Sequence, residues 1–252
     1  MSRARTGAVI QTRMGSSRLP GKVMLDLGGR PVIDHVIERV KQCARLDAIV
    51  IATTCLGQDD VIVERAERNG VRWFRGSELD VLARYYHAAR DNRLDVVVRI
   101  TSDCPLIDPC LVDAVVERFH TSGYDLVTNA GDDPGERTYP RGLDVEVFAF
   151  PALEEAFVNA TEDYQREHVT PYLYERKRVL SYRNTVDYSR YRWTLDTEED
   201  YRLLRAIYDQ CYRGKHDFYF MDVIALMERR PELARINAGV EQAGPRRPAR
   251  GA

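Results

Sequence analysis

The stretch that decides the fold is Gly7-Ala-Val-Ile-Gln-Thr-Arg-Met-Gly-Ser-Ser-Arg-Leu-Pro-Gly-Lys22. Its first five residues form a short apolar run, which is typical of a strand buried inside a sheet. The residues after Gln11 open a polar loop that carries three cations, Arg13, Arg18 and Lys22. A buried strand that leads into such a loop is the first unit of an α/β pattern, provided that helices and strands alternate after it.

Strand and helix patterns do alternate after this stretch. Apolar runs predict strands over residues 48–53, 71–74 and 95–101, and helical spacing predicts helices over residues 32–43, 59–69 and 79–93. Asp108 and Pro109 then open a helix that runs to about His120, because aspartate is a good N-cap and proline suits the first helical position. Four strands joined by helical crossovers predict a doubly wound, mostly parallel sheet.

The second half of the chain has a less regular pattern. We expect strands over residues 143–148, 179–182 and 192–196, and helices over residues 152–159, 163–176, 198–212 and 221–229. The whole predicts an α/β fold, a doubly wound mixed but mostly parallel sheet in three α/β/α layers, as a single domain over residues 1–240. Residues 241–252 are rich in proline and arginine and lack apolar anchors, which predicts a disordered tail.

Composition and charge exclude several classes of protein. The chain has 252 residues, of which 44% are hydrophobic, enough for one large core. Its net charge of −2 contrasts with the basic excess of general nucleic-acid and anionic-membrane binders. No apolar run reaches the roughly 18 residues of a membrane span, and no signal-peptide pattern precedes the first strand. The five cysteines lack paired short spacing, so we expect reduced thiols and a cytoplasmic protein that binds neither nucleic acid nor membrane.

The loop after the first strand lies where this fold class binds its ligands. Open parallel sheets bind ligands beyond the carboxyl ends of their strands. Three cations, together with backbone amides around Gly15 and Ser16, suit a polyphosphate. A solvated basic loop is the alternative.

Two common phosphate-binding motifs do not fit the loop. It lacks the Gly-x-Gly-x-x-Gly of dinucleotide-binding folds. The stretch from Gly15 to Lys22 approaches a P-loop, but it has one residue too many between its glycines, and Val23 replaces the magnesium-binding serine or threonine. We therefore expect neither a dinucleotide-binding protein nor a P-loop ATPase.

The string Gln11-x-Arg13-x-x-Ser16-x-Arg18-Leu-Pro-Gly-Lys22 resembles that of the cytidylyltransferases that make CMP-activated sugar acids from CTP. The likeness is strongest to the branch named for spore-coat polysaccharide biosynthesis, and it covers about residues 7–212. It implies a glycosyltransferase-A-like nucleotidyltransferase fold, CTP as substrate, Mg²⁺ as cofactor and a homodimer. Arg13 and Lys22 would hold the triphosphate, with Arg18 near it. We expect the nucleotide-binding half at about residues 7–128 and the acceptor half at about residues 129–230.

Two aspartates follow predicted strands and could hold the metal. Mg²⁺ prefers one or two carboxylates, with waters and phosphate oxygens completing its coordination. Asp103 is not needed as a helix cap, because Asp108 has that role, and Asp196 is left free by a capping-box pattern at residues 197–200. Both strings resemble magnesium motifs of the family, although a turn aspartate or a cap is the alternative. The predicted catalytic residues are Arg13, Lys22, Asp103 and Asp196, with Asp103 and Asp196 as metal ligands.

The nucleotide is expected to reach neighbouring strand ends. Thr53 ends the second predicted strand and points toward the same rim as the loop. The likeness to the family brings the segment around Ser77 near cytosine and ribose, although Ser77 or Glu78 could instead cap a helix. The predicted nucleotide-binding residues are Gln11, Thr12, Arg13, Gly15, Ser16, Arg18, Lys22, Thr53, Ser77 and Asp103.

Two strings in the second half resemble acceptor-side motifs of the spore-coat branch. Residues 140–147 place Asp144 and Glu146 on one face of a strand, and residues 166–168 begin a polar helix. A solvated strand face and a polar helix face are the alternatives. The predicted acceptor-binding residues are Arg141, Asp144, Glu146, Arg166, Glu167 and His168. The acceptor motifs of the sialic-acid and ketodeoxyoctonate enzymes are not clearly reproduced, which leaves the acceptor open.

These features predict a Mg²⁺-dependent cytidylyltransferase that transfers CMP from CTP to a sugar acid or to a small phosphate or phosphonate metabolite. Pyrophosphate would be released, and the product would serve surface polysaccharide or glycoconjugate synthesis. A glycosyltransferase or a transferase of another nucleotide on the same fold is one alternative. A non-catalytic nucleotide-binding protein is the other. The expected partners are CTP, an anionic acceptor and a second copy of the chain.

Overall fold

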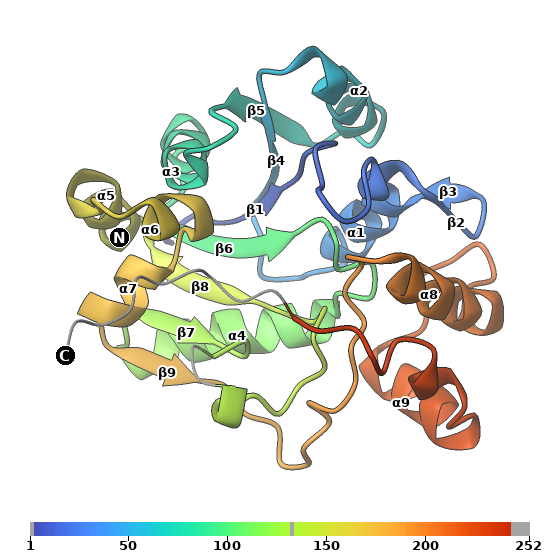
Figure 1. Cartoon of the computed structure of the whole chain (residues 1–252). Coiled ribbons are helices and arrows are strands. Elements are labelled where there is room, and N and C mark those ends of the chain that lie inside the picture. The colour runs from blue at the N-terminus through green and yellow to red at the C-terminus, as the bar shows by residue number, and fades with distance from the viewer. Residues whose placement is uncertain (1–2, 132–133, 243–252) are drawn as a thin grey trace.

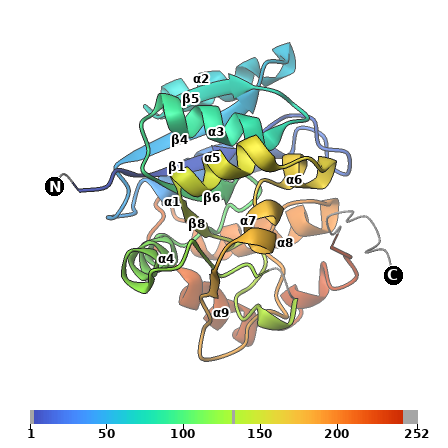
Figure 2. The same ribbon diagram turned by 90° about the vertical axis from the view of Figure 1, so that its left-hand side faces the viewer.

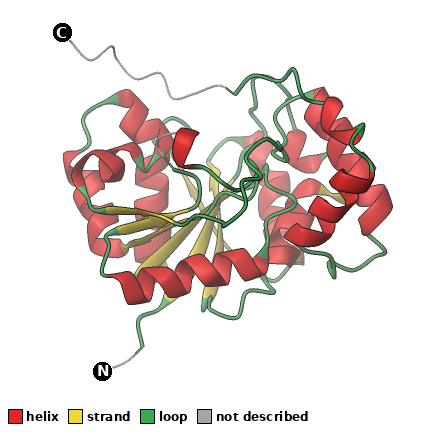
Figure 3. Ribbon diagram, turned by 90° about the horizontal axis from the view of Figure 1, so that it is seen from below, coloured by secondary structure: helices red, strands yellow, loops and turns green. Residues whose placement is uncertain are grey.

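A seven-stranded sheet with helices on both faces forms the centre of the computed structural model, which describes residues 3–131 and 134–242 (Figures 1 and 3). The strands of this sheet are β1 (Thr6–Gln11), β4 (Ala48–Thr54), β5 (Arg72–Gly76), β6 (Val96–Thr101), β7 (Leu126–Thr128), β8 (Glu146–Ala149) and β9 (Val179–Ser181). A small hairpin of β2 (Asp26–Leu27) and β3 (Arg30–Pro31) lies apart from it. The helices are α1 (Val32–Val40), α2 (Asp60–Arg68), α3 (Val81–Asp91), α4 (Pro109–Ser122), α5 (Phe150–Asn159), α6 (Asp163–His168), α7 (Pro171–Arg176), α8 (Glu198–Cys211) and α9 (Phe220–Arg229).

The strand order is β5-β4-β1-β6-β8-β7-β9, which confirms the doubly wound, mixed and mostly parallel sheet. The chain runs outward from β1 through β4 to β5 and then returns to β6 on the other side of β1. All of these strands are parallel, whereas β8 is antiparallel to both β6 and β7. The strand order therefore reverses between β1 and β6, which is where open α/β sheets bind ligands.

Burial on both faces explains the continuous apolar runs of the central strands. In β1, Ala8 and Ile10 pack into one core, and Val9 between them packs into the other. The first core lies beneath α1, α2, α4, α8 and α9. The second lies beneath α3, α5 and α7, which lie over the opposite face of the sheet (Figure 2). Two cores on one sheet give the predicted three layers.

Two predicted elements are wrong. Residues 192–196 form no strand, because the segment makes only one isolated bridge, from Arg192 to Arg141. Residues 163–176 form two helices, α6 and α7, because Val169 takes a left-handed φ of 73° and Pro171 starts a new helix. The short strands β2, β3 and β7 were not predicted.

Most of the predicted tail, residues 243–252, lies outside the described residues. The two tail residues that are described contact the protein: the Glu241 carbonyl accepts a hydrogen bond from Arg18 at 3.5 Å, and the Gln242 side chain accepts one from Arg192. Within residues 3–131 and 134–242, no helix combines the length and apolarity needed to cross a membrane.

Candidate functional site

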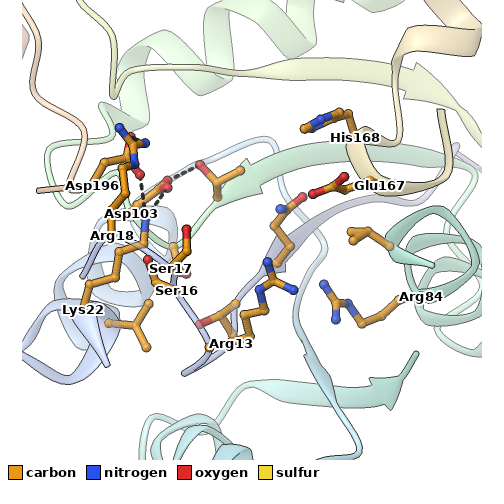
Figure 4. A pocket seen from close by; sticks show the side chains of 17 residues that line it. Arg13, Ser16, Ser17, Arg18, Lys22, Arg84, Asp103, Glu167, His168 and Asp196 are labelled. Carbon is orange, nitrogen blue, oxygen red and sulfur yellow. Dashed lines mark hydrogen bonds and ion pairs between the residues drawn. The ribbon is translucent and has the colours of Figure 1, made fainter. Parts of the chain in front are cut away.

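A cleft of about 310 Å³ opens at the carboxyl ends of β1 and β6, where the strand order reverses (Figure 4). Residues from four regions line it: the loop after β1, the end of β6, the first turn of α3 and the end of α6, together with Asp196 before α8. The predicted residues that line the cleft are Gln11, Thr12, Arg13, Gly15, Ser16, Arg18, Lys22, Asp103, Glu167, His168 and Asp196. The lining residues that were not predicted are Ser17, Val23, Val81, Arg84, Thr101 and Ser102.

Hydrogen bonds centred on Met14 hold the loop after β1 in shape. The Met14 carbonyl accepts from the backbone N–H groups of Ser16 and Gly21, each at 2.9 Å. Gly21 has φ 69°, a left-handed conformation that suits glycine, and it starts the short helical turn that carries Lys22. The Met14 N–H donates to the buried carboxylate of Asp59 at 2.8 Å. The loop is therefore held by its own backbone, and its cations are presented on a preformed frame.

Lys22 brings the two predicted metal ligands together (Figure 4). Its Nζ donates to Oδ2 of Asp103 at 2.9 Å and to Oδ1 of Asp196 at 2.8 Å. Nζ also donates to the Leu195 carbonyl at 2.7 Å. The Leu195 N–H in turn donates to the Asp103 carbonyl at 2.8 Å, which joins the two aspartate segments through their backbones. Three segments far apart in sequence thus converge on one ammonium group.

This cluster shifts the pKa values of its members. Burial alone would raise the pKa of Asp103, but the Lys22 charge and hydrogen bonds from Lys22 and Thr101 outweigh it and hold this pKa at about 2. Burial alone would lower the pKa of Lys22, but the charges of Asp103 and Asp196 outweigh it and raise this pKa. Asp103 and Lys22 are therefore both charged near neutral pH.

Asp103 and Asp196 are each oriented by a further neighbour. The Thr101 hydroxyl donates to Oδ1 of Asp103 at 2.5 Å. Arg192, which lies four residues before Asp196, donates to its Oδ2 at 2.8 Å, and Arg18 forms an ion pair with the same oxygen at 3.0 Å. Both carboxylates therefore have fixed orientations.

The helix caps expected next to these aspartates are confirmed. The Asp108 side chain accepts from the Leu111 N–H and caps α4. The Thr197 and Asp200 side chains form the capping box at the start of α8. Neither Asp103 nor Asp196 is needed as a cap, which leaves both for other chemistry.

The donor set of this cluster fits Mg²⁺. Carboxylate oxygens from Asp103 and Asp196 approach the same cationic position, which Lys22 Nζ takes here. Mg²⁺ is commonly held by one or two carboxylates, with waters and substrate phosphates completing its octahedron. Among the described residues there is no group of three or more His, Cys, Asp or Glu side chains that could form an all-protein metal cage. The pair therefore suits a metal that arrives with a phosphate ligand.

Two predicted nucleotide-binding residues lie outside the cleft lining. Thr53 is fully buried, and its hydroxyl donates to Asp59 at 3.3 Å, so it supports the carboxylate that anchors Met14. The Ser77 hydroxyl accepts from the Asp80 N–H at 3.0 Å and shapes the turn before α3. Asp80 caps α3 through the Ala83 N–H, so the alternative that Ser77 or Glu78 caps this helix is wrong.

The alternating pattern suggested that Asp144 and Glu146 share one strand face, with a solvated face as the alternative. The structure contradicts both, because each carboxylate forms its own ion pair. Glu146 is 4% exposed, lies directly across from Arg99 in the β6–β8 pair and forms an ion pair with it. The Tyr174 hydroxyl donates to the same carboxylate at 2.7 Å. Asp144 lies before β8 and forms a two-point ion pair with Arg137 at 2.5 and 3.2 Å. Neither carboxylate lines the cleft.

The other predicted acceptor-binding residues fall into two groups. Arg141 lines a separate cavity beside Arg192, and Arg166 forms an ion pair with Asp80 at 2.5 Å. Glu167 and His168 do line the cleft, although they end α6 and do not begin a helix. Burial lowers the pKa of His168.

Arg84 is a charged cleft residue that the sequence did not predict. It lies in the first turn of α3, four residues after the Asp80 cap, and is 2% exposed. A helix that starts at the carboxyl edge of a parallel sheet directs its first turn toward the ligand. An arginine in that turn was therefore the available signal.

Comparisons with known proteins identify the family of this chain. The family model for cytidylyltransferases matches residues 8–217. The chain is 34% identical to the spore coat polysaccharide biosynthesis protein SpsF of Bacillus subtilis, over 90% of this chain and 95% of that protein. It is 38% identical to a 3-deoxy-manno-octulosonate cytidylyltransferase of Anaeromyxobacter sp., over 43% of this chain and 44% of that protein.

A solved structure points to the same family. The structure of a cytidylyltransferase from Leptospira borgpetersenii superposes with a TM-score of 0.86 at 36% identity and covers 92% of this chain and 97% of that chain. The family match spans the loop after β1 and both aspartates of the cleft. The chain belongs to the cytidylyltransferase family.

Proposed function

We propose that this cytidylyltransferase transfers CMP from CTP to an anionic small-molecule acceptor, with Mg²⁺ as cofactor and release of pyrophosphate. The acceptor is a sugar acid or a small metabolite with a phosphate or phosphonate group, and the product serves surface polysaccharide or glycoconjugate synthesis. The observation that carries the proposal is the convergence of Lys22, Asp103 and Asp196 in one cleft at the sheet's carboxyl edge. The sugar-acid and spore-coat names of the two relatives support the choice of acceptor and pathway.

In this reaction an acceptor oxygen attacks the α-phosphorus of CTP; a sugar-acid hydroxyl releases its proton to solvent, whereas an ionised phosphate or phosphonate oxygen has none to lose. The bond from that phosphorus to the bridging oxygen breaks, and pyrophosphate leaves with the bond's electron pair. Asp103 and Asp196 would hold Mg²⁺, which when bound neutralises charge on the phosphate oxygens.

The loop cations supply the rest of the positive charge. Arg13 lies 3.6 Å from Glu78, Arg18 pairs with Asp196, and Lys22 pairs with both aspartates, so each cation has a carboxylate partner before the nucleotide binds. The triphosphate would replace these partners. Because the loop is already held by backbone hydrogen bonds, little reorganisation is needed when charge develops in the transition state.

A pyrophosphate-release assay tests the proposal. CTP, UTP, ATP and GTP are each combined with a panel of sugar acids, phosphorylated polyols and phosphonates, with and without EDTA. We expect release only when CTP, an acceptor and a divalent cation are all present, and a rate lower by about 100-fold or more in Asp103→Asn. Asp187→Asn, at an exposed residue that does not line the cleft, is the control.

Two outcomes would overturn the proposal. Wild-type turnover in Asp103→Asn would remove Asp103 from the site. Transfer of a sugar from a finished nucleotide-sugar without pyrophosphate release would indicate a glycosyltransferase on the same fold. The homodimer and the cytoplasmic location stay predictions, and light scattering on the purified chain checks the first of these.

A further inference from the structure

The cleft has two chemically different ends (Figure 4). Lys22, Asp103 and Asp196 form one end, where the proposed function places the phosphates. Arg84 and Glu167 lie at the other end. Because a nucleoside triphosphate is elongated, phosphates bound at the first end place the base toward the second. We propose that Glu167 and Arg84 select cytosine: the Glu167 carboxylate accepts from the exocyclic amine, and the Arg84 guanidinium donates to the ring carbonyl oxygen. This assignment rests on the proposed function.

Arg84 is a buried cation that lacks a full set of partners. Its Nη1 donates to the Ser77 carbonyl at 3.0 Å, but its Nε is buried and has no partner among the described residues. No described carboxylate forms an ion pair with it, and its guanidinium is directed into the cleft on the side of Arg13 (Figure 4). A buried charge without a counter-ion is costly unless a ligand provides acceptor atoms. Arg84 is therefore prepared to donate hydrogen bonds to something in the cleft.

Glu167 faces the same end of the cleft from α6. Its carboxylate has no hydrogen-bond or ion-pair partner within the described part of the chain, and it projects inward beside His168 (Figure 4). Val81, the first residue of α3, adds an apolar wall. A carboxylate acceptor, a guanidinium donor and an apolar surface together suit a flat heterocycle with polar edges.

The position of Glu167 relative to Arg84 is fixed by Arg166. Arg166 donates to Oδ2 of Asp80 from Nε at 3.1 Å and from Nη2 at 2.5 Å. Asp80 is the N-cap of α3, the helix that carries Arg84. Arg166 therefore joins the end of α6 to the start of α3, and we assign it as a positioning residue, not as an acceptor ligand.

A strained turn holds Glu167 from the other side. Val169 has φ 73° and ψ −58°, and the Thr170 N–H donates to the His168 carbonyl at 2.9 Å, which makes a γ-turn of the rare, strained type. A β-branched residue at positive φ is an outlier, and such strain is concentrated at ligand sites. Val169 is fully buried, so the core holds the turn in place.

The chemistry of this pair favours cytosine over uracil. An ionised carboxylate can only accept hydrogen bonds, and cytosine presents an amine where uracil presents a carbonyl oxygen. Cytosine therefore donates to Glu167, whereas uracil places two acceptors face to face. A matched carboxylate–amine contact of this kind is typically worth about tenfold to a hundredfold in selectivity.

Nucleotide binding without an acceptor tests the assignment. Calorimetry compares CTP, UTP and the pyrimidin-2-one ribonucleoside triphosphate, which lacks the exocyclic amine, in the presence of MgCl₂. Wild type should prefer CTP to UTP by about tenfold or more. Glu167→Gln should lower this ratio by about tenfold, because a carboxamide can donate to the uracil oxygen. In Glu167→Ala, CTP and the amine-free analogue should bind alike. The matched control is Glu228→Gln, on the exposed side of α9.

The outcomes separate this assignment from the proposed function. An unchanged CTP-to-UTP ratio in Glu167→Gln, with wild-type selectivity intact, overturns the role of Glu167 and leaves the proposed function standing. A wild-type protein that binds no nucleotide overturns both. Because Glu167 is exposed, its substitution should leave the melting temperature unchanged, and thermal unfolding checks this for each variant.

Discussion

Lys22 and Asp103 form a 2.9 Å ion pair although 81 positions separate them in the sequence. The same ammonium binds Asp196, so a protein cation holds the position where two carboxylates converge. Without ligand the charges of Lys22, Asp103 and Asp196 are therefore already paired. Replacing Lys22, Asp103 or Asp196 with an uncharged residue should therefore leave a remaining charge of this cluster without its partner.

Lys22→Met should make the protein less stable and more responsive to Mg²⁺. The change leaves Asp103 without its cation and removes the charge between it and Asp196, which keeps its ion pairs with Arg18 and Arg192. This should cost about 1–3 kcal/mol of unfolding free energy. Thermal unfolding in EDTA and in MgCl₂ should show a larger Mg²⁺-induced rise in melting temperature than in wild type. Lys41→Met, which removes an exposed lysine paired with Glu38, is the control. Equal Mg²⁺ responses in wild type and Lys22→Met would contradict convergence on a shared cation site.

Glu146→Gln should destabilise the fold and leave acceptor binding unchanged. Glu146 neutralises Arg99 inside the sheet, and breaking a buried pair costs about 3 kcal/mol or more. Urea denaturation measures the loss. Glu155→Gln, which removes a more exposed partner of Lys177, should cost no more than about 1 kcal/mol. A raised KM for the acceptor with unchanged stability would instead restore Glu146 to the acceptor site.

Gly142→Ala should impair both folding and turnover. Gly142 has φ 98°, and a Cβ there would lie 2.5 Å from the Trp193 carbonyl carbon and 2.6 Å from the Thr194 nitrogen. Strain and overlap together should cost about 2–5 kcal/mol. Because the displaced backbone leads directly to Asp196, the folded fraction should also lose activity. Gly57→Ala, where no atom lies within 4 Å of the added carbon, is the control. Unchanged stability in Gly142→Ala would show that this segment can move freely.

Stability should fall in mild acid because of a buried histidine pair. His35 Nε2 donates to the Leu27 carbonyl at 2.5 Å, which leaves its Nδ1 to accept from His216 Nε2 at 2.8 Å. Burial lowers the pKa of His35 to about 4 and that of His216 to about 3. As the pH falls, the histidines of the unfolded chain therefore take up protons before those of the folded protein. The stabilisation from the neutral pair is complete above pH 6.5, the ordinary pKa of histidine, and is lost as the pH falls toward the folded-state pKa values of about 4 and about 3.

Urea denaturation across this range measures the effect. Between about pH 6.5 and about pH 4.5 the unfolding free energy should drop by on the order of 3 kcal/mol. His216→Gln keeps an N–H donor for His35 and removes one titrating group, so the slope against pH should be roughly halved. His120→Gln, at an exposed histidine, should keep the wild-type slope. A wild-type slope in His216→Gln would exclude the pair as the cause.

The parts of the fold that depend on local signals could be predicted from the sequence. The Asp108 cap and the capping box at Thr197 depend on residues within one helical turn, and both are confirmed. The strand predicted over residues 192–196 is wrong. Trp193 and Leu195 are fully buried, as strand residues would be, but they pack into the core from a loop. Apolar alternation reports burial, and burial alone does not establish strand pairing.

Most site residues whose roles could not be predicted from the sequence depend on contacts between segments far apart in the chain. The role of Glu146 depends on the antiparallel register that sets it against Arg99, which no local pattern reveals. One signal was available, because Arg99 interrupts an otherwise apolar strand and so requires a buried counter-ion. Glu167 and His168 line the cleft, whereas Arg166 does not. This difference also depends on long-range packing, because Arg166 joins α6 to α3 through Asp80.

The backbone link between Leu195 and Asp103 has a consequence for synthesis on the ribosome. The loop after β1 and the strand before Asp103 emerge early, but Asp196 lies 174 positions after Lys22. A nascent or truncated chain that ends before this point can carry the loop but lacks the second carboxylate. If Asp196 is a metal ligand, as the proposed function has it, such a fragment should not consume CTP until the last quarter of the chain has been made and has docked.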